Sequence, residues 1–484
     1  MFAERVKFFA KDVLYFGLGN MLYSLVQFFS MPLVVKNMDK SQVANWNILL
    51  PTGVLLAAIV TFGMDSAVVR FVKDAETDQQ KRRIFSTGFF FETGLALLVL
   101  FSLVLFGSQF RQLIHLPDNY SSSWLVMLGW LPGVIMAQYF QNWFKYTFRR
   151  SLFVLLIGIQ SAVYLGGIVL LKLTGNINLL NVMWVMLASQ WVIVVAGFLY
   201  CKKMFVLSFD KRLLQKLVFY GLPFMIMAFG YNFISSFDRF ILLGKVSDEE
   251  FAVYSQTFRI TAIISMVVSS FNFAFGPFSL SMLGKKDAPE TFSRFHTYYL
   301  MIMCFAGLSF IALGKPIIQS FAGPDYTDGS KFVALFVMAY VFYGLYSFAQ
   351  LGIIYSTKSY LNLYTLLVGI LVLLITDITL VSKIKGYGTA AGFMLANIVM
   401  VLLANYFSKK YMPVKYHLVK DITLLLFFAA GGWGLNYLSL SQNIFSDAIF
   451  KLLIVLCLVT TLFFLLLSTS EKQYIKKLFS GRAA

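Results

Sequence analysis

Two arginines of this sequence, Arg239 and Arg259, lie inside long apolar segments, where a charged side chain is costly and by default suggests function. A guanidinium group presents a planar fork of donors that matches a phosphate. We therefore expect both arginines to bind an anionic group. An alternative stays open, because Asp238 could instead form a structural ion pair with Arg259. Adjacent residues on a helix face different directions, so Arg239 would still be free to contact a ligand.

Carboxylates other than Asp238 also fall within apolar segments, among them Glu92, Asp65 and Asp377. Glu92 lies deep in its segment, and we expect it to carry a coupling proton or cation or to contact the substrate. Asp65 and Asp377 lie near segment ends, where local pairing or snorkelling explains them better. The three histidines fall in or near loops and are expected at the surface: His115, His296 and His417.

Small polar residues follow helical spacing on three apolar segments and predict polar helix faces. Interhelical hydrogen bonds are a common use of such residues in membranes. Equivalent faces in both halves of the chain instead favour a shared, water-filled cleft that binds substrate. The residues concerned are Asn20, Ser24 and Gln27; Asn232 and Ser235 with Arg239; and Tyr343 and Gln350.

No pattern in the sequence predicts a catalytic site, a metal site or a cofactor. The three cysteines are far apart, with no metal or disulfide spacing, and are expected to pack as apolar residues. No GxxxxGK[ST] phosphate-binding loop occurs. We therefore expect a protein that is not an enzyme.

The elements that must position these residues are transmembrane helices. Of the 484 residues 59% are hydrophobic and 13% charged, and the mean hydropathy is +0.76. The apolar segments are long enough to cross about 30 Å of hydrocarbon. We expect an all-α, polytopic membrane protein with about fourteen transmembrane helices, at 13–35, 46–69, 84–107, 121–141, 151–171, 179–200, 217–243, 251–280, 295–313, 332–355, 361–381, 387–408, 421–440 and 449–468.

Loop charges orient these helices. With the N-terminus inside, 28 of the 40 Lys and Arg lie in cytoplasmic segments and 10 in outer ones. This bias predicts cytoplasmic N- and C-termini. It also explains the net charge of +18 without nucleic acid as a partner, since the positive charge is spread over all the inner loops.

The seventh expected helix begins like the first and indicates an internal repeat. Phe16-Gly17-Leu18 recurs as Tyr220-Gly221-Leu222, 204 residues later. A repeat of six helices keeps its orientation in the membrane, so its pseudo-twofold axis runs along the membrane normal. The sequence therefore predicts two pseudo-symmetric six-helix lobes, at 1–200 and 217–408. A cytoplasmic connector at 201–216 joins them, and two further helices with a basic cytoplasmic tail occupy 409–484.

Three segments resemble the Wzx-type polysaccharide flippases. They are SFDRFILLGKVSDEEFAVYSQTFRI (236–260), GMDSAVVRFV (63–72) and GYGTAAG (386–392). The superfamily to which these flippases belong also holds lipid II flippases and multidrug exporters. In the lipid II flippases arginines face the diphosphate. Arg259 matches one of these in position, whereas the first lobe offers no buried arginine.

The resemblance implies a cationic cleft between two lobes and a position in the bacterial inner membrane. It implies transfer of undecaprenyl-diphosphate-linked oligosaccharides, such as O-antigen units of lipopolysaccharide, from the cytoplasmic to the outer leaflet by alternating access. The expected partners are this lipid-linked glycan, membrane lipids and glycan assembly proteins. Coupling to H⁺ or Na⁺ stays open.

Other functions are weighed against this one. A drug or metabolite exporter of the same superfamily would need buried carboxylates for cationic drugs. A membrane glycosyltransferase or glycan polymerase would need a sizeable outer loop carrying catalytic groups, and the expected outer loops are short.

Overall fold

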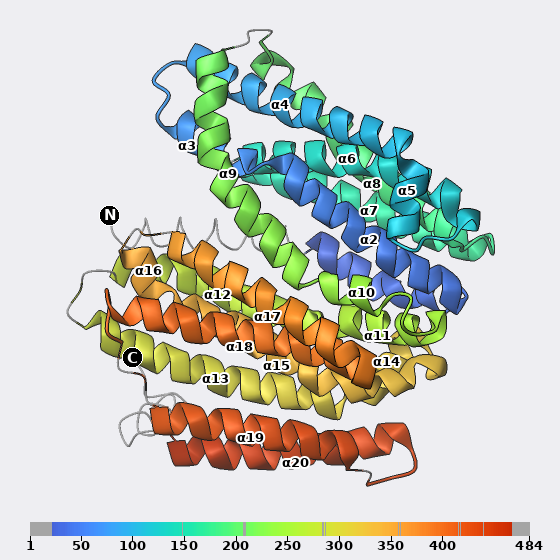
Figure 1. Ribbon diagram of the computed structural model, residues 1–484, viewed down its shortest axis with the longest axis vertical. Helices are drawn as coiled ribbons and strands as arrows, with labels where there is room; N and C mark the ends of the chain where they lie inside the picture. Colours follow the sequence, from blue (N-terminus) through green and yellow to red (C-terminus); the bar gives the residue numbers. More distant parts are fainter. Residues whose placement is uncertain are drawn as a thin grey trace. The chain divides into compact units, whose positions relative to one another are not determined.

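The computed structural model describes residues 22–466, apart from 148, 207–209, 283, 284, 286, 357, 359, 415, 417 and 439. The described residues form helices and connecting loops, as expected of an all-α protein (Figure 1). In the first half the elements are the helix Leu22–Val35, α2 (Lys40–Thr61), α3 (Met64–Lys73), α4 (Asp78–Leu105), α5 (Gly107–Leu113), η1 (Asp118–Tyr120), α6 (Ser121–Tyr146), α7 (Arg150–Leu173), α8 (Leu179–Cys201), η2 (Lys202–Met204), α9 (Lys211–Ile234) and α10 (Phe237–Leu242).

The second half continues the helical pattern. Its elements are α11 (Asp248–Thr261), α12 (Ile263–Met282), α13 (Ala288–Ala312), α14 (Gly314–Ala322), η3 (Pro324–Gly329), α15 (Ser330–Ala349), α16 (Leu351–Tyr355), α17 (Tyr360–Ile384), α18 (Gly386–Lys409), α19 (Leu418–Tyr437) and α20 (Ile444–Leu466).

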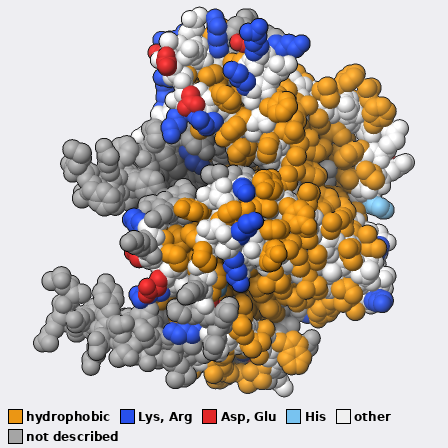
Figure 2. Space-filling view, turned by 60° about the vertical axis from the view of Figure 1, so that its left-hand side comes forward, with side chains coloured by type: hydrophobic (Ala, Val, Ile, Leu, Met, Phe, Trp, Pro, Cys, Tyr) orange, Lys and Arg blue, Asp and Glu red, His pale blue; other side chains and the backbone are white. Residues whose placement is uncertain are grey.

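Twelve helices in the described part of the chain are long and apolar enough to cross a membrane. Adding the shorter helix Leu22–Val35 and α19 gives one helix for each of the fourteen expected spans. Large hydrophobic side chains such as Leu98, Phe101 and Leu199 are exposed. Figure 2 shows hydrophobic side chains covering a broad part of the face in view. An exposed apolar surface of this kind suits lipid contact.

The chain forms two compact units. Unit 1 comprises Met1–Gln256, Phe321–Gly323 and Tyr360–Met400, and unit 2 comprises Thr257–Ser320, Pro324–Ser359 and Val401–Ala484. Within unit 1, α9 packs against α2, α3 and α17. Within unit 2, α19 and α20 pack on α13 (Figure 1). The division into two six-helix lobes stays a prediction.

Several expected spans are interrupted rather than continuous. The second span breaks between α2 and α3, where Phe62 and Gly63 both adopt left-handed backbone angles (φ 49° and 67°). The seventh breaks between α9 and α10, and the eighth at Ala262 between α11 and α12. Broken helices at membrane depth are tolerated where they face a cavity or are buried in protein. The first two breaks lie next to the polar residues described below.

Candidate functional site

The break between α2 and α3 is fixed by a close approach of two backbones. A Cβ atom added at Gly63 would lie 2.2 Å from the carbonyl oxygen of Gly221, and one added at Gly221 would lie 2.5 Å from that of Phe62. Only glycine allows this contact, and only glycine adopts the left-handed conformation of residue 63 without strain. The contact places α9 directly against the break.

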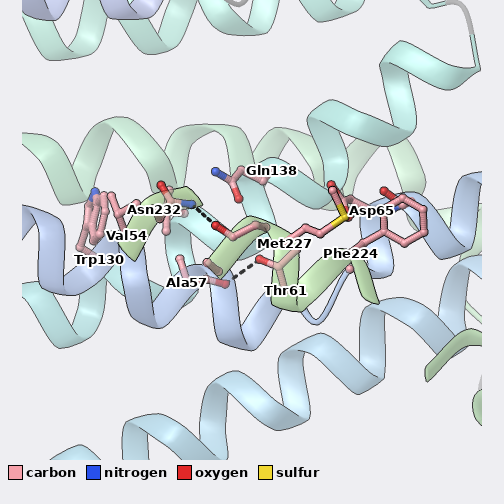
Figure 3. A pocket seen from close by; sticks show the side chains of 14 residues that line it. Val54, Ala57, Thr61, Asp65, Trp130, Gln138, Phe224, Met227 and Asn232 are labelled. Atoms are coloured by element: carbon pink, nitrogen blue, oxygen red, sulfur yellow. Dashed lines mark hydrogen bonds between the residues drawn. The ribbon is translucent and has the colours of Figure 1, made fainter. Parts of the chain in front are cut away.

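A cavity of about 430 Å³ lies beside this break in unit 1 (Figure 3). Its volume falls within the range of small-molecule sites. Its walls come from α2, α3, α6 and α9, and we call it the α2–α9 pocket. It is lined by Val54, Ala57, Ala58, Thr61, Gly63, Asp65, Ser66, Trp130, Val134, Gln138, Phe224, Met227, Ala228 and Asn232.

Two polar side chains of the α2–α9 pocket are held by hydrogen bonds within their own helices. The Asn232 Nδ2 group donates to the Ala228 carbonyl at 2.8 Å, and the Thr61 hydroxyl donates to the Ala57 carbonyl at 2.8 Å (Figure 3). Asp65 lies in the first turn of α3, where the helix dipole favours a carboxylate. Its Oδ1 atom accepts from the Ser66 backbone N–H at 2.8 Å.

Glu92, the expected coupling residue, lies on α4 and interacts electrostatically with Asp65, which lines the pocket. Its side chain is buried, and its Oε1 atom has no hydrogen-bond partner among the described residues. Asp65 is close enough to repel it electrostatically, and Lys145 at the end of α6 attracts Asp65. A buried carboxyl without a fixed partner can exchange a proton more readily than one held in an ion pair.

Arg239 and Asp238 form a second polar group, at α10. The Arg239 Nε atom lies 3.6 Å from Asp238 Oδ1, and their side chains are 12% and 0% exposed. The break after α9 leaves the Ser235 carbonyl outside a regular helix, and Arg239 donates to it. Tyr254 on α11 donates its hydroxyl to Asp238 Oδ2 at 2.6 Å. We call this set of residues the α10 cluster.

The other residues that the sequence analysis selected are distributed over both units. In unit 1, Ser24 is exposed, Gln27 and Ser235 are half-buried, and Asn20 lies outside the described residues. In unit 2, Arg259 and Gln350 are half-buried and Tyr343 is exposed. Among the described residues predicted to bind substrate, Asn232 lines the α2–α9 pocket, and Glu92 interacts electrostatically with Asp65, which also lines it.

Two expectations about ionisable residues were wrong. His296, expected at the surface, has a side chain only 14% exposed, with Nδ1 3.1 Å from Asp421 Oδ2. Asp377, expected to pair or snorkel, is fully buried, and neither of its oxygens has a hydrogen-bond partner among the described residues. Tertiary packing buries both side chains in a way that distance from a helix end does not predict.

Most residues of the α2–α9 pocket were not predicted from the sequence. Trp130 and Gln138 on α6 follow no polar periodicity, so no local pattern marks them. Asp65 did carry a signal, since it follows Phe62-Gly63 and a glycine within an apolar run marks a possible break. No group of three or more His, Cys, Asp or Glu in the described part of the chain is placed to hold a metal ion.

Comparison with solved structures identifies the fold. A lipid II flippase MurJ in an inward closed conformation has a TM-score of 0.65 and 14% sequence identity, covering 92% of this chain and 99% of that one. An inward-facing multidrug resistance MATE transporter of the MOP superfamily has a TM-score of 0.63 and 13% identity, covering 84% and 95%. An outward-facing transporter of that family has a TM-score of 0.57 and 14% identity, covering 86% and 96%.

Sequence comparison assigns the family. A search of curated protein sequences gave no significant match. The family model described as "Polysaccharide biosynthesis protein" matches residues 9–282, which is more than half of the 484 residues. The chain is thus a multi-pass membrane protein with the fold of flippases and MATE transporters, and it belongs to the polysaccharide biosynthesis protein family.

Proposed function

We propose that the protein is a flippase that moves undecaprenyl-diphosphate-linked oligosaccharides, such as O-antigen repeat units, from the cytoplasmic to the outer leaflet of the bacterial inner membrane. The observation that carries the proposal is family membership in polysaccharide biosynthesis together with a fold shared with a lipid II flippase. A diphosphate-sugar head group cannot cross hydrocarbon unaided, whereas its polyprenyl tail is soluble there. A polar path through the protein lowers that barrier, and both termini stay in the cytoplasm.

The arginines are proposed to hold the diphosphate during alternating access. Arg259 is half-buried and carries the charge that this role needs. Arg239 is engaged with Asp238 and the Ser235 carbonyl. It would have to exchange these contacts for the diphosphate in another conformation, which makes its role conditional on movement at the α9–α10 break.

Glu92 is proposed as the coupling group. Its burial and its Oε1 atom without a hydrogen-bond partner suit a carboxyl that takes up and releases a proton, and Asp65 lies close enough to respond to that charge. Substitution Glu92→Gln keeps the shape of the side chain but cannot ionise. We expect it to abolish stimulation of transport by a pH gradient while protein abundance stays normal.

The test uses the full-length protein in proteoliposomes with a fluorescent undecaprenyl-diphosphate disaccharide. Periodate added outside destroys only sugars in the outer leaflet, so flipping appears as a gain in the fraction destroyed. We expect protein-dependent flipping of a substrate that remains chemically unchanged. Absence of flipping, or elongation or release of the sugar, would reject the proposal.

A cation exporter is the second candidate, and one observation favours it. Asp65 lines the α2–α9 pocket, the buried Glu92 interacts with it electrostatically, and an exporter of cationic drugs needs buried carboxylates. Uptake of a fluorescent organic cation by the same proteoliposomes separates the two functions. Drug uptake without flipping of the lipid-linked disaccharide would favour the exporter.

A further inference from the structure

The polar side chains of the α2–α9 pocket supply both hydrogen-bond donors, from Gln138 and Ser66, and acceptors, from Asp65, Asn232 and Thr61. The amide N–H₂ of Asn232 and the hydroxyl proton of Thr61 are already donated to their own helices. What these side chains still offer is the Asn232 carbonyl oxygen and the lone pairs of the Thr61 hydroxyl. The Asp65 carboxylate adds acceptors only. A ligand that satisfies both kinds of group must bring donors and acceptors, as the hydroxyl groups of a sugar do.

The charges around the pocket also favour a ligand without negative charge. No Lys or Arg is among the fourteen residues that line it in the described part of the chain. Asp65 lines it directly and is the acidic residue among the lining residues. Lys145 offsets part of this negative charge. Like charges repel, so Asp65 disfavours a carboxylate on the ligand here.

The apolar lining supplies flat surfaces for a sugar ring. Trp130 and Phe224 lie towards opposite ends of the pocket in Figure 3, with Asn232 beside Trp130 and Asp65 beside Phe224. The buried Nε1 donor of Trp130 has no hydrogen-bond partner among the described residues. Buried polar groups without partners are costly, so a ligand oxygen in reach of this donor would stabilise the complex.

We propose that the α2–α9 pocket binds an uncharged sugar or an amino sugar of the transported glycan and selects against acidic sugars. The proposal rests on the flippase function and specifies which part of the substrate this pocket takes. It assigns the diphosphate to a different place, because no Lys or Arg in the described part of the chain lines the pocket. Asn232 and Thr61 accept from hydroxyls, and Asp65 sets the preference for ligands without negative charge.

The experiment measures binding of two matched probes to the full-length protein in nanodiscs by saturation-transfer NMR. Methyl β-D-glucoside and methyl β-D-glucuronide differ only in the carboxylate at C6. We expect the glucoside to bind and the glucuronide to bind at least about tenfold more weakly. In Asp65→Asn the two affinities should become similar. In Asn232→Ala both should weaken about threefold to tenfold, as the loss of one hydrogen bond predicts.

Thr379→Val provides the matched control. Thr379 is an exposed residue of α17 whose hydroxyl donates to the Ile375 carbonyl of its own helix at 2.7 Å, and it does not line the pocket. Its variant should bind both probes normally. Should Asp65→Asn fail to accumulate, Gln138→Glu tests the same point, because this added carboxylate should weaken the glucuronide further and leave the glucoside bound.

Equal or tighter binding of the glucuronide, no binding of either probe, or pocket variants that behave like Thr379→Val would overturn the inference. These outcomes are separate from the flipping assay. A protein that flips lipid-linked disaccharide but does not discriminate between the probes keeps the proposed function and loses this pocket assignment. A protein that binds the glucoside and discriminates against the glucuronide, but flips no lipid, would keep the pocket assignment and lose the proposed flippase function.

Discussion

The α10 cluster and the α2–α9 pocket are two polar regions of the same unit that are organised in opposite ways. In the α10 cluster Arg239 forms an ion pair with Asp238, Tyr254 donates a hydrogen bond to Asp238, and Asp238 is fully buried. In the pocket Asn232 and Thr61 bond only within their own helices and leave acceptors facing a cavity. A charge inside an apolar segment therefore marks a polar region, but the sequence alone does not show whether the groups of that region are available to a ligand.

The largest expected effect is at the α10 cluster. Substitution Asp238→Asn leaves the Arg239 guanidinium buried without its ion pair, which typically costs about 3–5 kcal/mol. We expect strongly reduced membrane abundance and a lower unfolding temperature. Adding Arg239→Gln should restore abundance, because no uncompensated charge remains.

The same experiment decides which arginine is the structural partner of Asp238. Rescue of Asp238→Asn by Arg259→Gln, and not by Arg239→Gln, would contradict the role given to Arg239 in the cluster. It would instead support the alternative raised from the sequence, in which Asp238 pairs with Arg259.

The next effect concerns the break that shapes the pocket. Gly63→Ala forces a non-glycine residue into a left-handed conformation, a strain of about 1–3 kcal/mol, and places its Cβ against the Gly221 carbonyl. We expect a clearly lower unfolding temperature. Gly94→Ala on α4 is the control, since a Cβ there meets nothing within 4 Å. If both variants melt alike, the close approach does not hold the break.

A smaller loss is expected from Tyr254→Phe. It removes the hydroxyl that donates to Asp238 and leaves the ring in place. A hydrogen bond to a charged group contributes about 1.5–3 kcal/mol to stability. The loss should be limited because Asp238 keeps its ion pair with Arg239. Thermal unfolding in detergent should show a decrease smaller than that of Asp238→Asn. A decrease as large would make Tyr254, rather than Arg239, the main partner of Asp238.

The smallest effect on stability is expected at Asn232. Its side chain bonds to the Ala228 carbonyl of its own helix. Asn232→Ala should therefore leave membrane abundance normal and change the free energy of unfolding by no more than about 0.5 kcal/mol. Flipping should nevertheless fall, because the pocket loses an acceptor. Normal flipping by this variant would show that transport does not depend on the Asn232 side chain in the pocket.

Sequence reasoning reached the architecture more completely than the site. Long apolar segments predict helices because the bilayer leaves few other structures possible, and each of the fourteen expected spans has a helix. The interruptions of these helices were harder to predict from the sequence than the helices themselves. The break at Gly63 depends on a contact with Gly221, 158 positions along the chain. Asn232 was found because polar periodicity is local. Trp130 and Gln138 were missed because the cavity they line forms only where residues of α2, α3, α6 and α9 come together.

The most direct test of the account locates the glycan itself. A lipid-linked disaccharide with a photoreactive diazirine on its sugar is irradiated with the full-length protein in nanodiscs, and crosslinked peptides are identified by mass spectrometry. The account predicts crosslinks on α6 and α9 at the pocket, around Trp130 and Met227, that excess unlabelled lipid-linked disaccharide suppresses. Crosslinks confined to the α10 cluster or to lipid-facing residues such as Phe101 and Leu199 would contradict it.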